Sequence, residues 1–127
     1  MEQQKTHKVL IIDDDPFIVD MYVIKLKDEH FDIETAHNGK EGLEKIKEYK
    51  PDVILLDIVM PGLDGFGVME ALRKEPGRTY KIILLTNLGQ KEDVERGMHL
   101  GVNDYLVKAH FTPSEVVTKI KDLLQKR

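Results

Sequence analysis

The sequence contains no cysteine among its 127 residues. Such a chain can form no disulfide framework, no cysteine-ligated zinc site and no thiol nucleophile. Long apolar segments are missing too, because no run approaches the ~20 residues that a membrane-spanning helix needs. Residues 1–8 are polar where a signal peptide would be apolar. We therefore expect a cytoplasmic protein that makes no contact with membranes.

An excess of positive charge is also absent, since 19 Lys and Arg stand against 23 Asp and Glu, a net charge of −4. Tight binding to nucleic acid depends on Lys and Arg that neutralise phosphates, so direct nucleic-acid binding is not expected. The 41% hydrophobic and 33% charged residues suit a packed core with a solvated surface. No linker, repeat or low-complexity stretch interrupts the chain. The length predicts one domain over 1–127, with a folded core over about 7–125.

Short apolar segments alternate five times with longer amphipathic ones. The expected strands cover residues 8–12, 31–36, 53–56, 81–85 and 105–107. The first, third and fourth are continuously apolar, which favours parallel strands covered on both faces. Five βα units in this order predict an α/β fold, a doubly wound five-stranded parallel sheet with helices on both faces.

Capping signals place the helices between these strands. Asp15-Pro16 opens the first helix, Asn38 with Glu41 opens the second, Lys50-Pro51 closes the second, Gly101 ends a fourth over about 90–100, and Thr112-Pro113-Ser114-Glu115 opens the fifth. The third helix, near 66–73, is the least favoured by propensity, because Gly65 and Gly67 disfavour its first turn. Asp64 with Gly65 is interpreted as a turn.

Polar side chains able to do ionic chemistry follow four of the five expected strands. These are Asp13-Asp14-Asp15, Asp57, Thr86 and Lys108. In a doubly wound sheet, ligands bind beyond the carboxyl ends of the strands, so these groups are expected to meet. Clustered carboxylates repel one another unless a cation such as Mg²⁺ neutralises them. A carboxylate can also attack phosphorus, so the pattern predicts chemistry on a phosphoryl group.

Four motifs together resemble the response-regulator receiver family. They are Ile11-Ile12-Asp13-Asp14-Asp15-Pro16, Leu55-Leu56-Asp57-Ile58-Val59-Met60-Pro61-Gly62-Leu63-Asp64-Gly65, Leu85-Thr86 and Asp104-Tyr105-Leu106-Val107-Lys108. The resemblance covers essentially the whole chain, in the family's order and spacing. It implies a flavodoxin-like receiver fold and a phosphorylation switch of two-component signalling, which catalyses only its own phosphorylation and dephosphorylation.

The resemblance also implies a role for each matching residue. Asp57 is the phosphoacceptor, and Thr86 and Lys108 contact the phosphoryl group. The implied ligands of Mg²⁺, which Mn²⁺ could replace, are Asp13, Asp14, Asp57 and the backbone carbonyl of Val59, with Asp14 direct and Asp13 through water. Thr86 and Tyr105 form the implied conformational switch.

The resemblance implies partners as well. The phosphodonor is the phosphohistidine of a sensor histidine kinase or a phosphotransfer protein, and the output is a downstream protein target or effector domain. A phosphorylation-dependent homodimer is possible on the surface of the fourth helix, fifth strand and fifth helix. The sequence leaves open whether the receiver stands alone or belongs to a longer regulator.

The sequence departs from the family pattern at three places. Ala109 follows Lys108 where a proline is usual, which leaves open whether that peptide bond is cis or trans. Asn87 follows Thr86 where a small residue is commoner. Val59 and Leu88, each two residues past a site residue, cannot orient water, so we predict slow self-dephosphorylation.

Rival interpretations are weaker but distinct. A haloacid-dehalogenase-like phosphatase needs a second acid where Val59 stands. An FMN-binding flavodoxin needs a phosphate-cradling loop where three aspartates stand. A pseudo-receiver that acts as a phosphorylation-independent interaction module is the remaining alternative. Asp15 is interpreted as a helix cap, and the histidines, which show no metal-ligand spacing, as surface or loop residues without a role in phosphotransfer.

Overall fold

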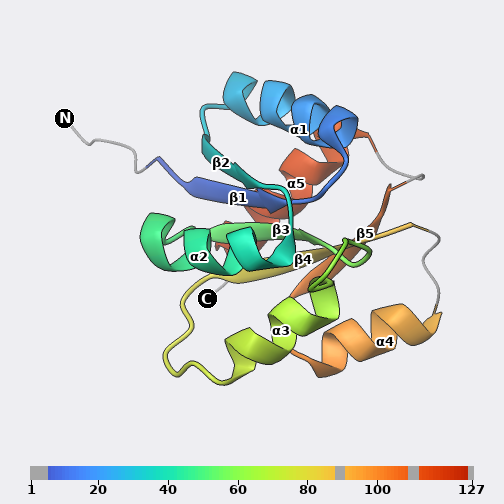
Figure 1. Cartoon of the computed structure of the whole chain (residues 1–127). Coiled ribbons are helices and arrows are strands. Elements are labelled where there is room, and N and C mark those ends of the chain that lie inside the picture. Colours follow the sequence, from blue (N-terminus) through green and yellow to red (C-terminus); the bar gives the residue numbers. More distant parts are fainter. Residues whose placement is uncertain (1–5, 88–90, 109–111, 126–127) are drawn as a thin grey trace.

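The computed structural model describes residues 6–87, 91–108 and 112–125. Its strands are β1 (Lys8–Ile12), β2 (Asp32–Ala36), β3 (Val53–Asp57), β4 (Lys81–Thr86) and β5 (Asp104–Val107). Its helices are α1 (Pro16–Asp28), α2 (Gly39–Tyr49), α3 (Gly65–Arg73), α4 (Lys91–His99) and α5 (Pro113–Gln125). All strand pairs are parallel and the sheet order is β2-β1-β3-β4-β5. The predicted doubly wound α/β fold is confirmed (Figure 1).

The predicted helix signals act as expected, with element ends that shift by one or two residues. The Asp15 carboxylate accepts hydrogen bonds from the first-turn N–H groups of Phe17 and Ile18. At α2, Asn38 Oδ1 accepts from the N–H of Glu41 at 2.8 Å, and the Glu41 carboxylate accepts from the N–H of His37. Local sequence therefore sets where these helices begin.

The sheet separates two hydrophobic cores (Figure 1). Helices α1 and α5 cover one face, where Val19, Tyr22 and Ile120 pack against strand residues. Helices α2, α3 and α4 lie on the other face, where Phe66, Met69 and other buried residues form the second core. The apolar residues of β1, β3 and β4 are buried on both faces, which explains why these strands are continuously apolar.

Strand order reverses between β1 and β3, so the crevice at their carboxyl ends is where a ligand is expected. Ile12 pairs with Leu56, and the register therefore places Asp13 and Asp57 side by side on neighbouring strands. Within the ranges that the structure describes, no helix combines the length and apolar character needed to cross a membrane.

Candidate functional site: an acidic pocket at the strand ends

Three aspartates converge at the carboxyl ends of β1 and β3. Asp13, Asp14 and Asp57 each offer a carboxylate oxygen, and these atoms all lie within 4.8 Å of one another. Asp13 is fully buried and Asp57 is 3% exposed, whereas Asp14 is exposed to solvent. The predicted acidic cluster is therefore formed, with one carboxylate at its mouth and two at its base.

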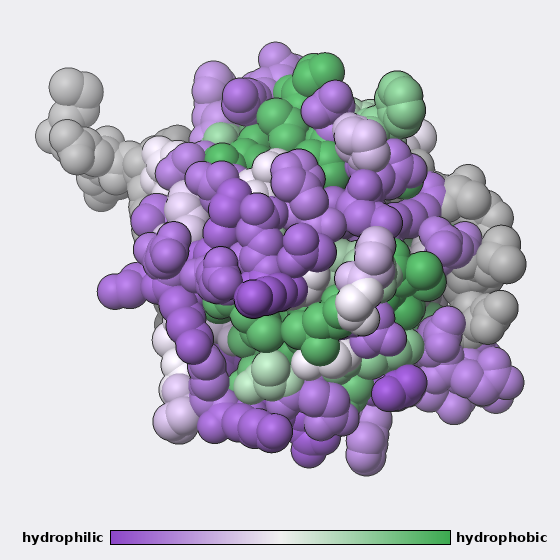
Figure 2. All heavy atoms as spheres, viewed as in Figure 1, coloured by the Kyte–Doolittle hydropathy of each residue, from purple (hydrophilic) through white to green (hydrophobic). Residues whose placement is uncertain are grey.

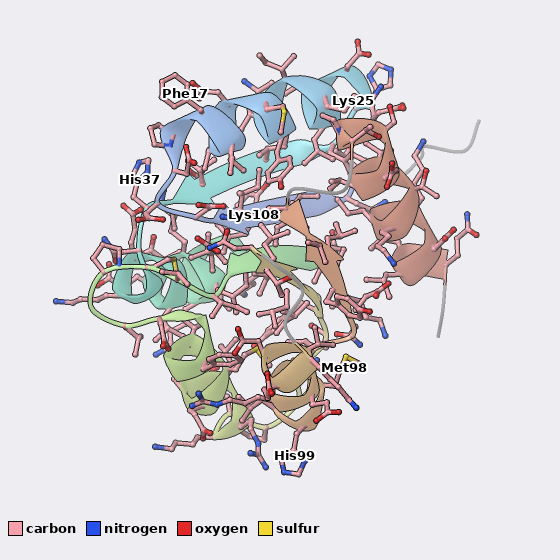
Figure 3. The ribbon with its side chains drawn as sticks, turned by 90° about the vertical axis from the view of Figure 1, so that its right-hand side faces the viewer. Phe17, Lys25, His37, Met98, His99 and Lys108 are labelled. Atoms are coloured by element: carbon pink, nitrogen blue, oxygen red, sulfur yellow. The ribbon has the colours of Figure 1, made fainter. Side chains whose placement is uncertain are left out.

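Lys108, directly after β5, supplies the positive charge at the base of the pocket. Its Nζ lies 2.8 Å from Asp13 Oδ2 and 3.1 Å from Asp57 Oδ1. The side chain is only 10% exposed. Figure 3 shows Lys108 near the centre of the strand ends, between α1 on one side and α3 and α4 on the other. Lysine and both buried carboxylates thus form one ionic cluster.

Burial and charge shift the pKa values of this cluster. Burial raises the pKa of Asp57 to about 6, and the Asp13 carboxylate adds to the increase while Lys108 opposes it. Burial by itself lowers the pKa of Lys108, but Asp13 and Asp57 outweigh it and the pKa is raised. Burial, and then the charges of Asp13 and Asp57, raise the pKa of Tyr22 on α1. At neutral pH the pocket therefore holds a charged lysine, a neutral tyrosine and a largely ionised Asp57.

The backbone of the acidic run orients Asp13. The N–H of Asp15 donates to Asp13 Oδ1 at 2.9 Å, while the Asp15 side chain turns away to cap α1. Asp15 is thus a helix cap, as predicted. Oδ2 of Asp13 lies close to Lys108 but has no partner of hydrogen-bond geometry among the described residues. The charge of this oxygen is balanced by the Lys108 ammonium, 2.8 Å away.

The donor set fits Mg²⁺. All three acidic side chains offer hard oxygen ligands, which Mg²⁺ prefers. Their oxygens lie close enough together for one hydrated cation to neutralise all three, directly or through its water ligands. The exposed Asp14 leaves one side of the cluster open to water, as a partly hydrated ion requires.

Gly65 is a site-building residue that sequence reasoning missed. Its N–H donates to Ile58 O at 2.8 Å. A Cβ added at Gly65 would lie 2.3 Å from the backbone oxygen of Asp57, so only glycine lets α3 begin against the end of β3. Asp64 caps this helix by accepting from the N–H of Gly67 at 2.8 Å. The sequence did contain a signal for this contact. A glycine at a position where it disfavours the start of a helix often marks a close approach of two backbone segments.

The two implied switch residues lie on the neighbouring strands β4 and β5 and differ in burial. Thr86 is buried, and its hydroxyl donates to the Leu106 carbonyl at 3.4 Å. Tyr105 is 39% exposed, so its ring is turned toward solvent. The Val59 side chain, two residues past the end of β3, is 64% exposed, and Asn87 is exposed.

Some predictions fall on residues outside the described ranges. These are Leu88, Ala109 with the Lys108–Ala109 peptide bond, and His110. The other histidines, His7, His30, His37 and His99, are exposed or half-buried. None of them joins the acidic cluster.

Comparison with known proteins gives one consistent family. The family model described as the response regulator receiver domain matches residues 9–121. ResD of Bacillus subtilis, a transcriptional regulatory protein, is 37% identical over 126 residues, which are 99% of this chain and 51% of that protein. The DNA-binding response regulator MtrA of Mycolicibacterium smegmatis is 34% identical over 119 residues, covering 94% of this chain and 51% of that protein. The chain thus spans about half the length of these curated relatives.

Solved structures agree with the sequence relatives. The chemotaxis response regulator CheY4 of Vibrio cholerae superposes with a TM-score of 0.85 at 31% identity, covering 93% of this chain and 98% of that one. The receiver domain of the Francisella response regulator 1452 gives a TM-score of 0.85 at 35% identity, covering 93% of this chain and 96% of that one. The likeness therefore extends over nearly the whole of both receiver chains.

Proposed function

Because this chain belongs to the response-regulator receiver family, we propose that Asp57 accepts a phosphoryl group and thereby switches the domain between two states. The chain is a receiver domain of two-component response regulators, a signalling switch rather than a classical enzyme. One observation carries the choice of Asp57. It is the carboxylate at the end of the central strand that contacts the lysine and shares the cluster with both other acids.

The proposed reaction is an in-line displacement at phosphorus. A carboxylate oxygen of Asp57 forms the new O–P bond while the P–N bond of a donor phosphohistidine breaks, and the electron pair leaves on the imidazole nitrogen. The pKa of about 6 leaves Asp57 largely ionised at neutral pH, as a nucleophile requires. Lys108 lies 3.1 Å from the attacking carboxylate and is positioned to neutralise charge on the transferred group.

Asp13, Asp14, Asp57 and the backbone carbonyl of Val59 are the proposed ligands of Mg²⁺. The bound ion supplies charge neutralisation for the phosphoryl oxygens. In this arrangement Asp15 keeps Asp13 Oδ1 occupied, so that Oδ2 faces the cluster. Asp14, at the open side, is proposed to bind directly and Asp13 through water.

The proposed switch begins with Thr86. A phosphoryl group on Asp57 offers a stronger acceptor than the Leu106 carbonyl at 3.4 Å, so the hydroxyl turns toward it. Tyr105 then moves from its exposed position into the space that Thr86 leaves. The change is read on the surface of α4, β5 and α5, where a target, an effector domain or a second receiver binds. The proposed donor is a histidine kinase or phosphotransfer protein.

The first test is intact mass after incubation with Mg²⁺ and a small-molecule phosphodonor. We expect one added phosphoryl group in the native chain, none in Asp57→Asn and none after Mg²⁺ is chelated. Asp15→Asn is the matched control, since asparagine still caps α1 and the third acid of the run lies outside the proposed ligand set. A native chain that stays unmodified, also with candidate kinases, would establish the pseudo-receiver alternative instead.

A further inference from the structure

The loop that joins β3 to α3, residues 58–64, lies beside the amino end of α2 (Figure 1). Ile58 and Met60 are buried, whereas the other residues of the loop are exposed. The exposed side chains include those of Val59 and Leu63, and Figure 2 shows hydrophobic surface between α2 and α3. The outer part of the loop is therefore held in place by backbone contacts more than by burial of its side chains.

Gly39, the first residue of α2, makes the closest of these contacts. A Cβ added at Gly39 would lie 2.4 Å from Leu63 O and 3.1 Å from Leu63 Cβ. It would also lie 2.9 Å from Cγ2 of Val68 on α3. The distance to Leu63 O is far inside van der Waals contact, and a backbone atom cannot turn away as a side chain can. Only glycine at position 39 therefore lets the loop lie against the buried start of α2.

The start of α2 is fixed from its other sides. Asn38 Oδ1 accepts from the N–H of Glu41 at 2.8 Å, and Asn38 O accepts from the N–H of Gly42 at 2.9 Å. Gly42 packs closely on β1, since a Cβ added there would lie 2.7 Å from Ile12 Cδ1. The helix has little room to retreat toward the sheet, so a side chain at position 39 would displace the exposed loop.

The other end of the same loop lies at the acidic pocket. The N–H of Gly65 donates to Ile58 O at 2.8 Å and closes the loop at its base. Val59, the residue after Ile58, carries the backbone carbonyl that is a proposed ligand of Mg²⁺. Only residues 60–62 separate Val59 from Leu63. A displacement of Leu63 away from α2 is therefore transmitted along a short, closed loop to the proposed ligand.

We propose that Gly39 is a positioning residue for the metal site, because its lack of a side chain holds the β3–α3 loop where the Val59 carbonyl can bind Mg²⁺. Gly39 contacts neither the ion nor the phosphoryl group and acts through the loop. The inference rests on the proposed function, since it takes the Val59 carbonyl as a ligand. Loss of a contact that orients a metal ligand typically weakens metal binding about 10- to 100-fold, so Gly39→Ala should weaken Mg²⁺ binding about tenfold or more.

The test measures the affinity of the unphosphorylated full chain for Mg²⁺. The affinity follows from the stabilisation of the folded chain against heat as the Mg²⁺ concentration rises at constant ionic strength. The metal-free chain is the baseline of each titration, so a variant that is only less stable keeps the native dissociation constant. Trimethylamine N-oxide in every sample keeps weakly stable variants folded.

Gly67→Ala is the matched control. A Cβ added at Gly67 would lie 2.4 Å from Cδ1 of the same Leu63, which is the end of a 36% exposed side chain that can turn toward solvent. We expect this variant to bind Mg²⁺ as the native chain does. The double variant Gly39→Ala/Val68→Ala removes the contact with Val68 and keeps the contact with Leu63 O. We expect it to bind Mg²⁺ as weakly as Gly39→Ala.

Each departure from these results overturns the proposal in its own way. A Gly39→Ala chain with native affinity shows that Gly39 only packs, whatever its effect on stability. Native affinity in the double variant shows that the substitution acts through α3 and not through the loop. A Gly67→Ala chain as weak as Gly39→Ala shows that the backbone contact at position 39 is not specific.

Failure of the proposed function has a different signature. A native chain that binds no Mg²⁺ removes the proposed metal site and this inference with it. A native chain that binds Mg²⁺ and takes up a phosphoryl group, beside a Gly39→Ala chain of equal affinity, overturns the inference alone. The mass measurement on the native chain tests phosphorylation of Asp57 separately.

Discussion

The Lys108 ammonium lies 2.8 Å from Asp13 Oδ2, closer than its 3.1 Å approach to Asp57 Oδ1. Without a metal, the lysine therefore balances two buried carboxylates and not Asp57 alone. Removal of one partner from a buried ionic cluster leaves uncompensated charge, which is costly in a low-dielectric interior. This arrangement makes the stability of the domain depend on the same groups as its proposed chemistry.

Lys108→Met should destabilise the metal-free domain. We expect the free energy of unfolding at pH 7.5 to fall by about 3 kcal/mol, because Asp13 and Asp57 lose their shared cation. The loss should shrink near pH 5, where a carboxyl can accept a proton, and in an Asp57→Asn background. Urea denaturation followed by circular dichroism measures both effects. An equal loss at both pH values would mean that Lys108 acts through packing and not through its charge.

The raised pKa of Asp57 predicts a specific pH dependence of metal-free stability. The carboxyl titrates near 3.8 ordinarily and near 6 in the folded chain, so between these values the folded chain holds a proton that the unfolded chain has released. The free energy of unfolding should therefore fall as pH rises from about 4 to about 6.

Asp57→Asn removes this titration. At pH 7 without Mg²⁺ the variant should be more stable than the native chain by about 1 to 3 kcal/mol. Denaturation curves of both proteins from pH 4 to 8, with a chelator present, provide the comparison. Parallel curves would contradict the raised pKa.

Val59 should make the phosphoryl group long-lived. Its side chain is 64% exposed at the position two residues past Asp57, and a valine cannot hydrogen-bond an attacking water. Val59→Asn should therefore shorten the lifetime of the phosphorylated chain severalfold, and Val59→Ala should leave it nearly unchanged. The decay of the phosphorylated mass after removal of the donor gives each rate. If the asparagine variant decays no faster than the native chain, position 59 does not limit hydrolysis.

A tryptophan at position 105 should report the proposed switch. The chain has no tryptophan, and Tyr105 is 39% exposed, so Tyr105→Trp introduces a single solvated reporter. Phosphorylation should shift its emission to shorter wavelength as the ring moves inward, and Thr86→Val in the same background should abolish the shift. Tyr80→Trp is the control, because Tyr80 directly precedes β4 and so lies at the edge of the sheet opposite the site. An emission shift that persists in the Thr86→Val background would show that the ring at position 105 moves without help from the Thr86 hydroxyl.

Local sequence was sufficient to predict the type and order of the helices and strands. Cap residues such as Asp15, Asn38 and Thr112 bond to N–H groups three residues away or fewer, so their effect is readable from the sequence around them. The acidic run, Asp57 and Lys108 were predictable as one site, because the carboxyl ends of parallel strands share an edge of the sheet. The role of Gly65 was not predicted. Its helix propensity is unfavourable, but the absence of a side chain allows α3 to begin against the Asp57 backbone.

Spacing along the chain was thus enough to predict the fold class, the acidic cluster and the family resemblance. The burial of Asp13 beside an exposed Asp14, and the closer approach of Lys108 to Asp13 than to Asp57, became known from the folded chain. The folded chain alone showed that Phe17 and Ile24 face solvent although they are apolar residues in a helix next to the core. Burial and ion pairing depend on which surfaces of distant elements meet, and the spacing of residues along the chain does not contain that information.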